Sequence, residues 1–385
     1  MLRKIKVGLL VDEFFGGAKT AFGGYGFLAR HYICRYIPCA DIQIDVLLKR
    51  GKRDFFPQHF HVDDVDVYYL PRKYQHMQRF LRMKNYDVYL SIELTNPSAD
   101  ILQKDLELSR KQLILWIQDP RPLYEWDEIN TVQLFPEKCY YYQPTYDFVN
   151  KLNQRGLVSF ISQGYFLNAK AVDLYGLPKY TPIQYLPNPV EIDTHFDVQT
   201  YEKKNMIIFL GRVESVKRGW LFCEIAQTMP TYEFYVLGKT TRQKEENARI
   251  LEKYMKIPNL HFVGHVEGAR KEQFLKDAKI LVNTSIHEAL PVSFLEALSY
   301  GTLLVSNRNP ENLTAQFGAW TGDVLGDGFD KIELFVNAIH QLMADEPRRK
   351  KLACAAVEYI KERHSVPKFV EDLRHCIRSN VQSVK

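Results

Sequence analysis

The sequence predicts an α/β protein with two doubly wound, Rossmann-like domains, each built on a parallel sheet that helices cover on both faces. Short apolar runs alternate with longer polar stretches of helical character through the 385 residues, which is the pattern of parallel sheets. The alternation breaks near residues 185–190, where two prolines begin a polar run, and this break indicates a domain boundary. Ligands of such domains bind at the carboxyl ends of the strands, so we expect the two sheets to face each other across a ligand-binding cleft.

The individual strands are expected wherever a short apolar run is bounded by turn or helix signals. In the first series they are residues 5–11, 42–48, 67–70, 88–92, 113–117, 140–143 and 159–162. In the second series they are residues 206–210, 233–237, 261–263, 280–283 and 303–306. The domains are therefore expected over residues 1–198 and 199–365, and the amphipathic segment 366–385 is expected to return as a helix that packs on the first domain.

The composition is that of a globular protein that remains in the cytoplasm. Hydrophobic residues make up 46% and charged residues 25% of the chain, both ordinary values for such proteins. Basic residues precede the first apolar run as in a signal peptide, but Asp12 and Glu13 end that run too early, and no apolar segment is long enough to span a bilayer. The six cysteines lack metal or disulfide spacing, which fits a reducing compartment, and a net charge of +5 is too small to indicate nucleic acid.

Basic residues are concentrated in the first quarter of the chain. Over residues 72–84 they interleave with aromatic and methionine residues at near-helical spacing, which suits a helix lying peripherally on the anionic inner face of a membrane. The alternative is a solvated helix whose apolar face points into the domain. The basic residues concerned are Lys49, Arg50, Lys52, Arg53, Arg72, Lys73, Arg79, Arg82 and Lys84.

The segment 280–306 carries the strongest chemical signal: a buried strand, a loop with Glu288, a helix with Glu296, and a second buried strand. Pro291 occupies the position that proline prefers at the start of a helix, so the next three backbone N–H groups, through Phe294, are expected to be free for an anion such as phosphate. The two glutamates flank that anion site, and carboxylates are good acceptors for paired hydroxyl groups. The pattern therefore favours a sugar phosphate or nucleotide sugar over glutamates that are solvated or only complement the helix dipole.

Two further loops follow strands of the same expected sheet. Gly211 permits close backbone approach, Arg212 offers a bidentate fork and Lys217 a mobile point charge, which together suit a diphosphate. Residues 264–266 follow the third strand of this domain. Because the carboxyl ends of parallel strands meet at one edge, these loops and the Glu288 loop are expected to form one site for a nucleotide diphosphate.

In these motifs the chain resembles the retaining glycosyltransferases of family 4, enzymes with the two-domain GT-B fold. The family has two glutamates with seven residues between them (the EX7E motif), a Gly-Arg pair with a downstream lysine, a Pro-Asn before an acidic stretch, and an amino-terminal Gly-Gly loop. The matching residues are Glu288, Glu296, Ala297, Gly301, Gly211, Arg212, Lys217, Pro187, Asn188, Gly23 and Gly24.

The resemblance implies a hexosyltransferase that needs neither a metal nor another cofactor and uses no protein nucleophile. Arg212 and Lys217 would hold the donor diphosphate, and the leaving diphosphate would help to deprotonate the incoming hydroxyl on the same face of the sugar. Glu288 would face the transferred sugar and Glu296 the ribose. The further donor contacts implied are Gly23, Gly24, Gly211, Gly264, His265, Val266, Ala289, Leu290, Pro291, Val292 and Ser293.

The chain departs from the family pattern at three places. Pro291 replaces a common glycine and removes one backbone donor, and Pro189 follows Asn188 where glycine is frequent. A family histidine near the reacting sugar is absent, and the corresponding strand ends in Gln118-Asp119. We expect Asp119, or else Gln118, to take its place; the alternative is an aspartate that only caps a loop.

Other signals are weaker, and other functions stay open. Asp64 and Asp66 lie in the wrong domain for a diphosphate-bound cation, and His265 and His287 are expected to be hydrogen-bonded loop residues. The expected function is transfer of a hexose or deoxyhexose from a nucleotide sugar to a polysaccharide or lipid-linked oligosaccharide, with aromatic side chains of the first domain stacking on the acceptor. The alternatives are a nucleotide-sugar 2-epimerase of the same architecture, for which no acid/base set is evident, and a non-catalytic module that binds nucleotide sugars.

Overall fold

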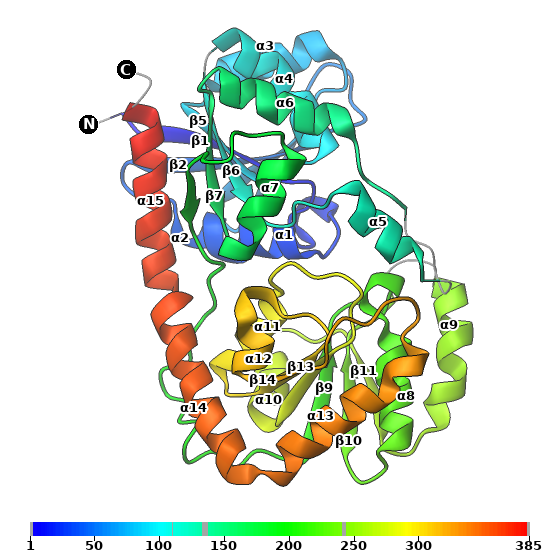
Figure 1. Ribbon diagram of the computed structural model, residues 1–385. Coiled ribbons are helices and arrows are strands. Elements are labelled where there is room, and N and C mark those ends of the chain that lie inside the picture. Colours follow the sequence, from blue (N-terminus) through cyan, green and yellow to red (C-terminus); the bar gives the residue numbers. More distant parts are fainter. Residues whose placement is uncertain (1–2, 110, 133–137, 241–243, 383–385) are drawn as a thin grey trace. The chain divides into compact units, whose positions relative to one another are not determined.

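The structure of the protein is a computed structural model that describes residues 3–109, 111–132, 138–240 and 244–382 (Figure 1). The chain forms two compact units. Unit 1 comprises Met1–Pro120, Tyr142–Pro189 and Val366–Lys385, and unit 2 comprises Arg121–Tyr141 and Val190–Ser365. Each unit holds a largely parallel sheet flanked by helices, so the predicted fold class is confirmed.

Unit 1 is built on an eight-stranded sheet with the order β3-β4-β2-β1-β5-β6-β7-β8. Neighbouring strands are parallel except β3, which runs antiparallel to β4 at the edge. Every residue of β5 is buried, as expected for a central strand covered on both faces. The strands are β1 (Ile5–Leu10), β2 (Ile42–Arg50), β3 (Gln58–Val62), β4 (Val65–Leu70), β5 (Val88–Ile92), β6 (Gln112–Ile117), β7 (Val158–Ser162) and β8 (Ile183–Tyr185). The helices are α1 (Gly24–Phe27), α2 (Cys34–Tyr36), α3 (Tyr74–Lys84), α4 (Asn96–Ser109), α6 (Gln143–Gln154), α7 (Asn168–Leu174) and α15 (Val366–Gln382).

Unit 2 is built on a six-stranded, wholly parallel sheet with the order β11-β10-β9-β12-β13-β14. The strands are β9 (Met206–Leu210), β10 (Glu233–Leu237), β11 (Leu260–Gly264), β12 (Ile280–Asn283), β13 (Leu303–Ser306) and β14 (Gly318–Trp320). The helices are α5 (Leu123–Asn130), α8 (Gly219–Thr228), α9 (Lys244–Glu252), α10 (Gly268–Asp277), α11 (Val292–Ser299), α12 (Leu313–Gln316), α13 (Ile332–Ala344) and α14 (Glu346–Arg363). The loops that leave the carboxyl ends of these strands therefore share one edge of the sheet.

A helix from the first half of the sequence belongs to unit 2. α5 places Trp126 and Ile129 in the hydrophobic core of that unit. The structure therefore differs from the predicted division between residues 198 and 199, because unit 2 takes residues 121–141 and begins again at Val190. A local pattern can place a helix but does not reveal the sheet against which it packs.

The strand predicted over residues 140–143 is wrong, because Gln143 begins α6 with a proline in its first turn and Tyr141 packs on the core of unit 2. Three strands that the sequence pattern does not predict, β3, β8 and β14, all lie at sheet edges. β8 and β14 have three residues each, and β3 alternates half-buried and exposed residues. These three edge strands are short or partly exposed and bury little surface, so a search for apolar runs does not reveal them.

The six cysteines are free thiols, and Cys34, Cys223 and Cys376 are buried. Burial raises the pKa of the Cys376 thiol to about 11, so this group stays protonated at neutral pH. None of the described helices combines the length and the apolar character that crossing a membrane requires.

Candidate functional site

Glu288 lies in the loop between β12 and α11, at the carboxyl edge of the sheet of unit 2. Its side chain is 7% exposed. Oε1 accepts hydrogen bonds from Lys217 Nζ at 2.5 Å, Ser285 Oγ at 2.5 Å and Asn283 Nδ2 at 3.0 Å. Burial raises the pKa of the carboxyl, but the charge of Lys217 and the hydrogen bonds outweigh it and hold the pKa below its usual value. Glu288 is therefore ionised at neutral pH, with a cation beside it.

The loop after β9 supplies both cations of the predicted diphosphate clamp. Lys217 reaches Glu288, while Arg212 Nη1 lies 3.1 Å from Glu214 Oε2. Each cation thus pairs with a carboxylate of unit 2, whereas the sequence predicts a diphosphate as their partner. The side chains of Arg212 and Lys217 are 39% and 23% exposed, so a ligand in solution can reach both.

Arg218, which the sequence motifs do not single out, ties this loop to the Glu288 loop. Its buried guanidinium donates to the carbonyl oxygens of Thr284 at 2.6 Å, Ser285 at 3.3 Å and Gly326 at 2.9 Å. Burial lowers the pKa of Arg218 to about 10, so the group keeps its charge at neutral pH. Its three partners lie in distant loops, so no local pattern could have revealed this role.

Helix α11 begins one residue later than predicted. Pro291 is an extended cap residue with φ of −64° and ψ of 130°, and the helix starts at Val292. The Phe294 N–H donates to the Pro291 carbonyl at 3.0 Å, so the expectation that it is free for an anion is wrong. Glu296, on this helix, accepts from Lys271 Nζ of α10 at 2.6 Å, a partner that the motifs do not reveal.

Glycines at the carboxyl ends of β9, β10 and β11 let three backbone segments lie close together. A Cβ on Gly238, after β10, would lie 1.8 Å from the carbonyl oxygen of Gly211, after β9, so only glycine fits there. Gly264 ends β11 with φ of +81° and pairs with Gly238 in an isolated bridge. The Val266 side chain is buried in the core, which leaves backbone as the ligand-facing part of that residue. Of the other predicted donor contacts, Leu290 is buried, His265 is exposed, and Ala289, Val292 and Ser293 are half-buried.

In unit 1 the predicted Gly-Gly pair lies after β1, at the start of α1, whose first residue is Gly24. Gly23 caps α1, and a Cβ there would lie 1.7 Å from Glu13 Oε1. A carboxylate therefore fills the space beside Gly23, while the space beside Gly24 is open. The negative charge of Glu13 opposes the phosphate that this loop is predicted to approach.

The two candidate residues in the loop after β6 differ in burial: Gln118 is buried and Asp119 is half-buried. Gln118 is 2% exposed, and its Nε2 donates to Asn188 Oδ1 at 3.0 Å, within a buried amide network that also contains Gln163. The backbone N–H groups of Gln118 and Asp119 donate to Glu93 Oε2 at 2.9 Å and 2.7 Å. Gln118 therefore serves the interior of unit 1, and the half-buried Asp119 is the candidate of the two for contact with a substrate.

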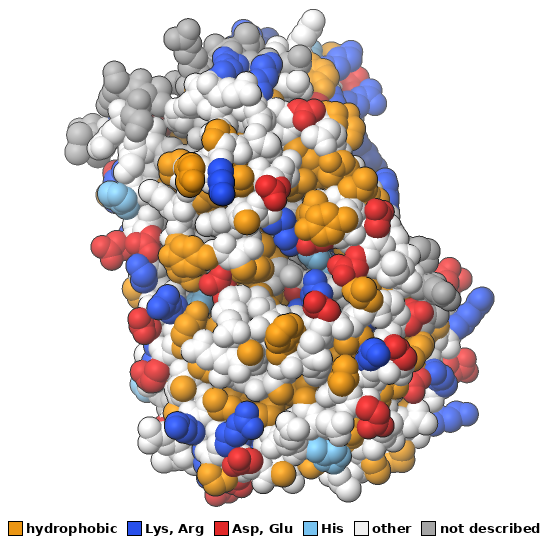
Figure 2. Space-filling view, in the orientation of Figure 1, with side chains coloured by type: hydrophobic (Ala, Val, Ile, Leu, Met, Phe, Trp, Pro, Cys, Tyr) orange, Lys and Arg blue, Asp and Glu red, His pale blue; other side chains and the backbone are white. Residues whose placement is uncertain are grey.

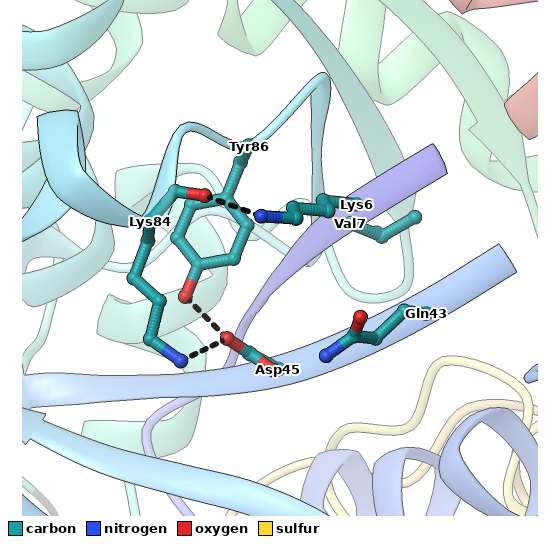
Figure 3. Close-up of a pocket in the computed structure, with 6 residues that line it drawn as sticks. All are labelled: Lys6, Val7, Gln43, Asp45, Lys84 and Tyr86. Carbon is teal, nitrogen blue, oxygen red and sulfur yellow. Dashed lines mark hydrogen bonds and ion pairs between the residues drawn. The ribbon is translucent and has the colours of Figure 1, made fainter. Parts of the chain in front are cut away.

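A cavity of about 80 Å³ in unit 1 is lined by Lys6, Val7, Gln43, Asp45, Lys84 and Tyr86 (Figure 3). It lies at the amino ends of β1 and β2 and is too small for a nucleotide sugar, so it is not the candidate site. Among the described residues, no group of three His, Cys, Asp or Glu side chains is arranged to hold a metal ion.

Known proteins resemble this chain in one sequence segment and in its fold. Residues 191–359 match the family model of glycosyl transferases group 1. Sucrose-phosphate synthase from Thermosynechococcus elongatus aligns over 99% of this chain and 100% of its own, with 13% identity and a TM-score of 0.75. HepE of Anabaena in complex with UDP-glucose aligns over 97% and 100%, with 12% identity and a TM-score of 0.69. The pneumococcal O-GlcNAc transferase GtfA, in complex with UDP and GlcNAc, aligns over 84% and 70%, with 14% identity and a TM-score of 0.59. No curated protein sequence matches significantly.

The architecture and the matched segment define the protein as a glycosyltransferase with the GT-B fold. More particularly, unit 2 carries a glycosyl transferase group 1 domain. All predicted site residues of this unit, from Gly211 to Glu296, lie within the matched segment. The coarser part of the predicted function, a glycosyltransferase, is thereby confirmed.

Proposed function

We propose that the protein is a retaining glycosyltransferase that moves a hexose or deoxyhexose from a UDP-sugar to a polysaccharide or lipid-linked oligosaccharide. The observation that carries the proposal is the ionised Glu288, 7% exposed and beside Lys217 at the carboxyl edge of the sheet. A buried ion pair at such an edge is costly to fold and is typical of functional sites. The choice of UDP rests on HepE and GtfA, whose structures contain UDP-glucose or UDP.

The donor diphosphate would bind where Arg212 and Lys217 now meet carboxylates. It would exchange the Arg212–Glu214 and Lys217–Glu288 pairs for charge-assisted hydrogen bonds to phosphate oxygens. Glu288 would then accept from a sugar hydroxyl through Oε2, while the neutral donors to Oε1 stay in place. The site would thus trade internal ion pairs for ligand contacts, and the fold itself would not have to change.

The rest of the nucleotide would meet the neighbouring loops. The ribose hydroxyls would bind Glu296, whose carboxylate is held in place by its Lys271 partner. The base would lie against the backbone of residues 264–266, where the open space beside Gly264 leaves room for close approach.

The proposed transfer needs no protein nucleophile and no metal ion. The bond between the anomeric carbon and the diphosphate oxygen breaks, and the acceptor oxygen bonds to that carbon on the same face. The acceptor proton passes to the leaving diphosphate. Arg212 and Lys217 stabilise the charge that develops on this leaving group, which we expect to be the main catalytic effect. Asp119 would contact the sugar or the acceptor in place of the family histidine.

A thermal-shift screen with UDP, GDP, dTDP and ADP, each with and without EDTA, tests the donor. We expect stabilisation by UDP that persists in EDTA. If no nucleotide stabilises the protein, the proposed donor site is wrong; if EDTA abolishes the shift, metal independence is wrong.

The reaction class is tested by NMR of the products formed from a UDP-sugar and an acceptor. We expect UDP to be released and the anomeric configuration to be retained. An inverted linkage would overturn retention, and an isomerised sugar still attached to UDP would indicate the epimerase instead.

The acceptor half of the proposal includes an anionic membrane surface around α3. Most apolar residues of this helix are core, since Met77, Phe80 and Leu81 are buried, which agrees with the solvated-helix alternative. Exposed apolar side chains nevertheless remain at Phe56 and Met83, which are 74% and 72% exposed. Figure 2 shows basic and hydrophobic side chains next to one another over this part of unit 1. Such a mixture suits shallow insertion into an anionic bilayer surface.

Flotation with phosphatidylserine-rich vesicles at low salt tests this surface. The double variant Arg79→Glu/Arg82→Glu should lose at least about tenfold in vesicle binding, because two attractive charges become repulsive. The matched control is Lys350→Glu/Lys351→Glu on α14, which removes the same net charge from unit 2 and should bind like the wild type. Equal binding by all three proteins would remove the membrane from the proposal.

A further inference from the structure

We propose that Glu125 is a positioning residue for the donor sugar, because through His287 it holds the loop that carries Glu288. Glu125 Oε2 lies 3.5 Å from His287 Nδ1, and the two side chains are 7% and 1% exposed. The inference rests on the proposed function, in which Glu288 faces the transferred sugar.

The contact joins two groups that are unfavourable to bury separately. A buried carboxylate and a buried imidazole each lose hydration, and their mutual contact offsets part of that loss. Glu125 stands in the first turn of α5, whose Trp126 and Ile129 are seated in the core of unit 2. The carboxylate is therefore a fixed point against which the His287 ring is placed.

The Glu288 loop is held on both sides, and His287 lies between the two anchors. On the amino-terminal side, the Ile286 N–H donates to the Val216 carbonyl at 2.9 Å. On the carboxyl-terminal side, α11 begins at Val292. His287 is the residue directly before Glu288, so displacement of its ring would carry the neighbouring carboxylate with it. Misplacement of a reacting group by about 1 Å is enough to impair a site.

Hydrogen exchange of the unliganded full-length protein tests the contact itself. Glu125→Ala and His287→Leu should accelerate exchange over residues 285–291. Asp127→Ala, which removes the same charge from an exposed position of α5, is the matched control and should leave that segment unchanged. His287→Asn keeps a donor in the place of Nδ1 and should restore the slow exchange. If Glu125→Ala does not fold, the comparison of His287→Leu with His287→Asn carries the test, and Glu125→Gln, which keeps the volume and an acceptor oxygen, should differ little from the wild type.

Equal exchange of residues 285–291 in Glu125→Ala and Asp127→Ala would overturn the proposal, whatever the donor is. Faster exchange throughout unit 2 would also overturn it, because Glu125 would then support the fold and not this loop in particular. Failure of His287→Asn to restore slow exchange would exclude the Nδ1 contact as the cause.

Calorimetric affinities for UDP and UDP-glucose separate positioning from stability. In Glu125→Ala and His287→Leu, the Kd for UDP should stay within about twofold, whereas the Kd for UDP-glucose should rise about tenfold, an ordinary size for coupling between residues in contact. The double variant should be no weaker than either single variant. Equal losses for both ligands would contradict the proposal. A wild-type protein that binds neither ligand would refute the proposed donor, and the exchange experiment would still decide the Glu125–His287 contact.

Discussion

Replacement of Lys217 by methionine should destabilise unit 2 through the carboxylate that it leaves behind. Methionine keeps most of the side-chain volume and removes the charge. Glu288 then remains 7% exposed, with hydrogen bonds to Ser285 and Asn283 but without its cation. The variant therefore isolates the charge of Lys217 from the packing of its stem.

The size of the effect follows from the burial of the two partners. Removing one member of a buried ion pair costs about 3–5 kcal/mol, because the other charge is left uncompensated. Lys217 is 23% exposed, and Glu288 keeps its two neutral donors, so the cost should lie at the low end. We expect the free energy of unfolding to fall by about 3 kcal/mol near pH 8.

The loss should depend on pH in a defined direction. In the wild type the folded pKa of Glu288 is lowered, so its stabilising contribution is present above the usual glutamate pKa and is lost as the pH falls through the folded pKa. In the variant, burial without a cation raises the folded pKa, so the carboxylate costs stability above that pKa and the cost disappears on protonation. The difference between the two proteins should therefore be largest near pH 8 and should shrink steadily as the pH falls to about 4.5 and below.

Urea unfolding followed by tryptophan fluorescence measures this difference. Three of the four tryptophans, Trp126, Trp220 and Trp320, lie in unit 2, so the signal reports mainly on that unit. The control is the double variant Lys217→Met/Glu288→Gln, which removes both charges of this pair and should recover most of the lost stability. A loss that is independent of pH, or a double variant as unstable as Lys217→Met, would refute the reasoning.

Glu288→Gln should reduce transfer at least about a hundredfold while changing the Kd for UDP by less than about twofold, as measured by UDP release and calorimetry; unchanged turnover would remove Glu288 from the site. Arg212→Ala should weaken UDP binding by about 1.5–3 kcal/mol, the contribution of a charged hydrogen bond, and equal affinity would contradict the clamp. Gly238→Ala should destabilise the protein by at least about 2 kcal/mol, because its Cβ would lie 1.8 Å from the Gly211 carbonyl oxygen. Gly211→Ala, whose Cβ would have Phe209 at 4.0 Å as its nearest neighbour, should keep the stability and weaken UDP binding; equal urea midpoints for the two alanine variants would contradict the steric argument.

Local sequence patterns were sufficient to predict the core strands. They were also sufficient to predict which edge of the second sheet carries the candidate site. The five strands predicted for the second series are all present, because each is a short apolar run between turns. Their parallel order places the loops of Glu288, Arg212 and Gly264 at one edge, since the carboxyl ends of parallel strands coincide. Prediction from apolar runs fails for β3, β8 and β14, because these edge strands are short or partly exposed and do not need an apolar run.

The partners of the site residues could not be predicted in this way. Residue type and spacing predict that Lys217 and Arg212 bind phosphate, but in the structure the same positive charge attracts Glu288 and Glu214. Lys271 belongs to no recognised motif. It contacts Glu296 only because the fold brings this residue of α10 next to α11.

The sequence by itself determined the two parallel sheets, their approximate extents and the motif-bearing edge of the second sheet, because these depend on periodicity and chain order. Only the tertiary structure decided that α5 belongs to unit 2, that Arg218 fastens the Lys217 loop to the Glu288 loop, and that Glu125 meets His287. The physical reason is that such contacts join residues far apart in the chain. Their strength depends on burial and distance, and both are defined only once the elements have packed.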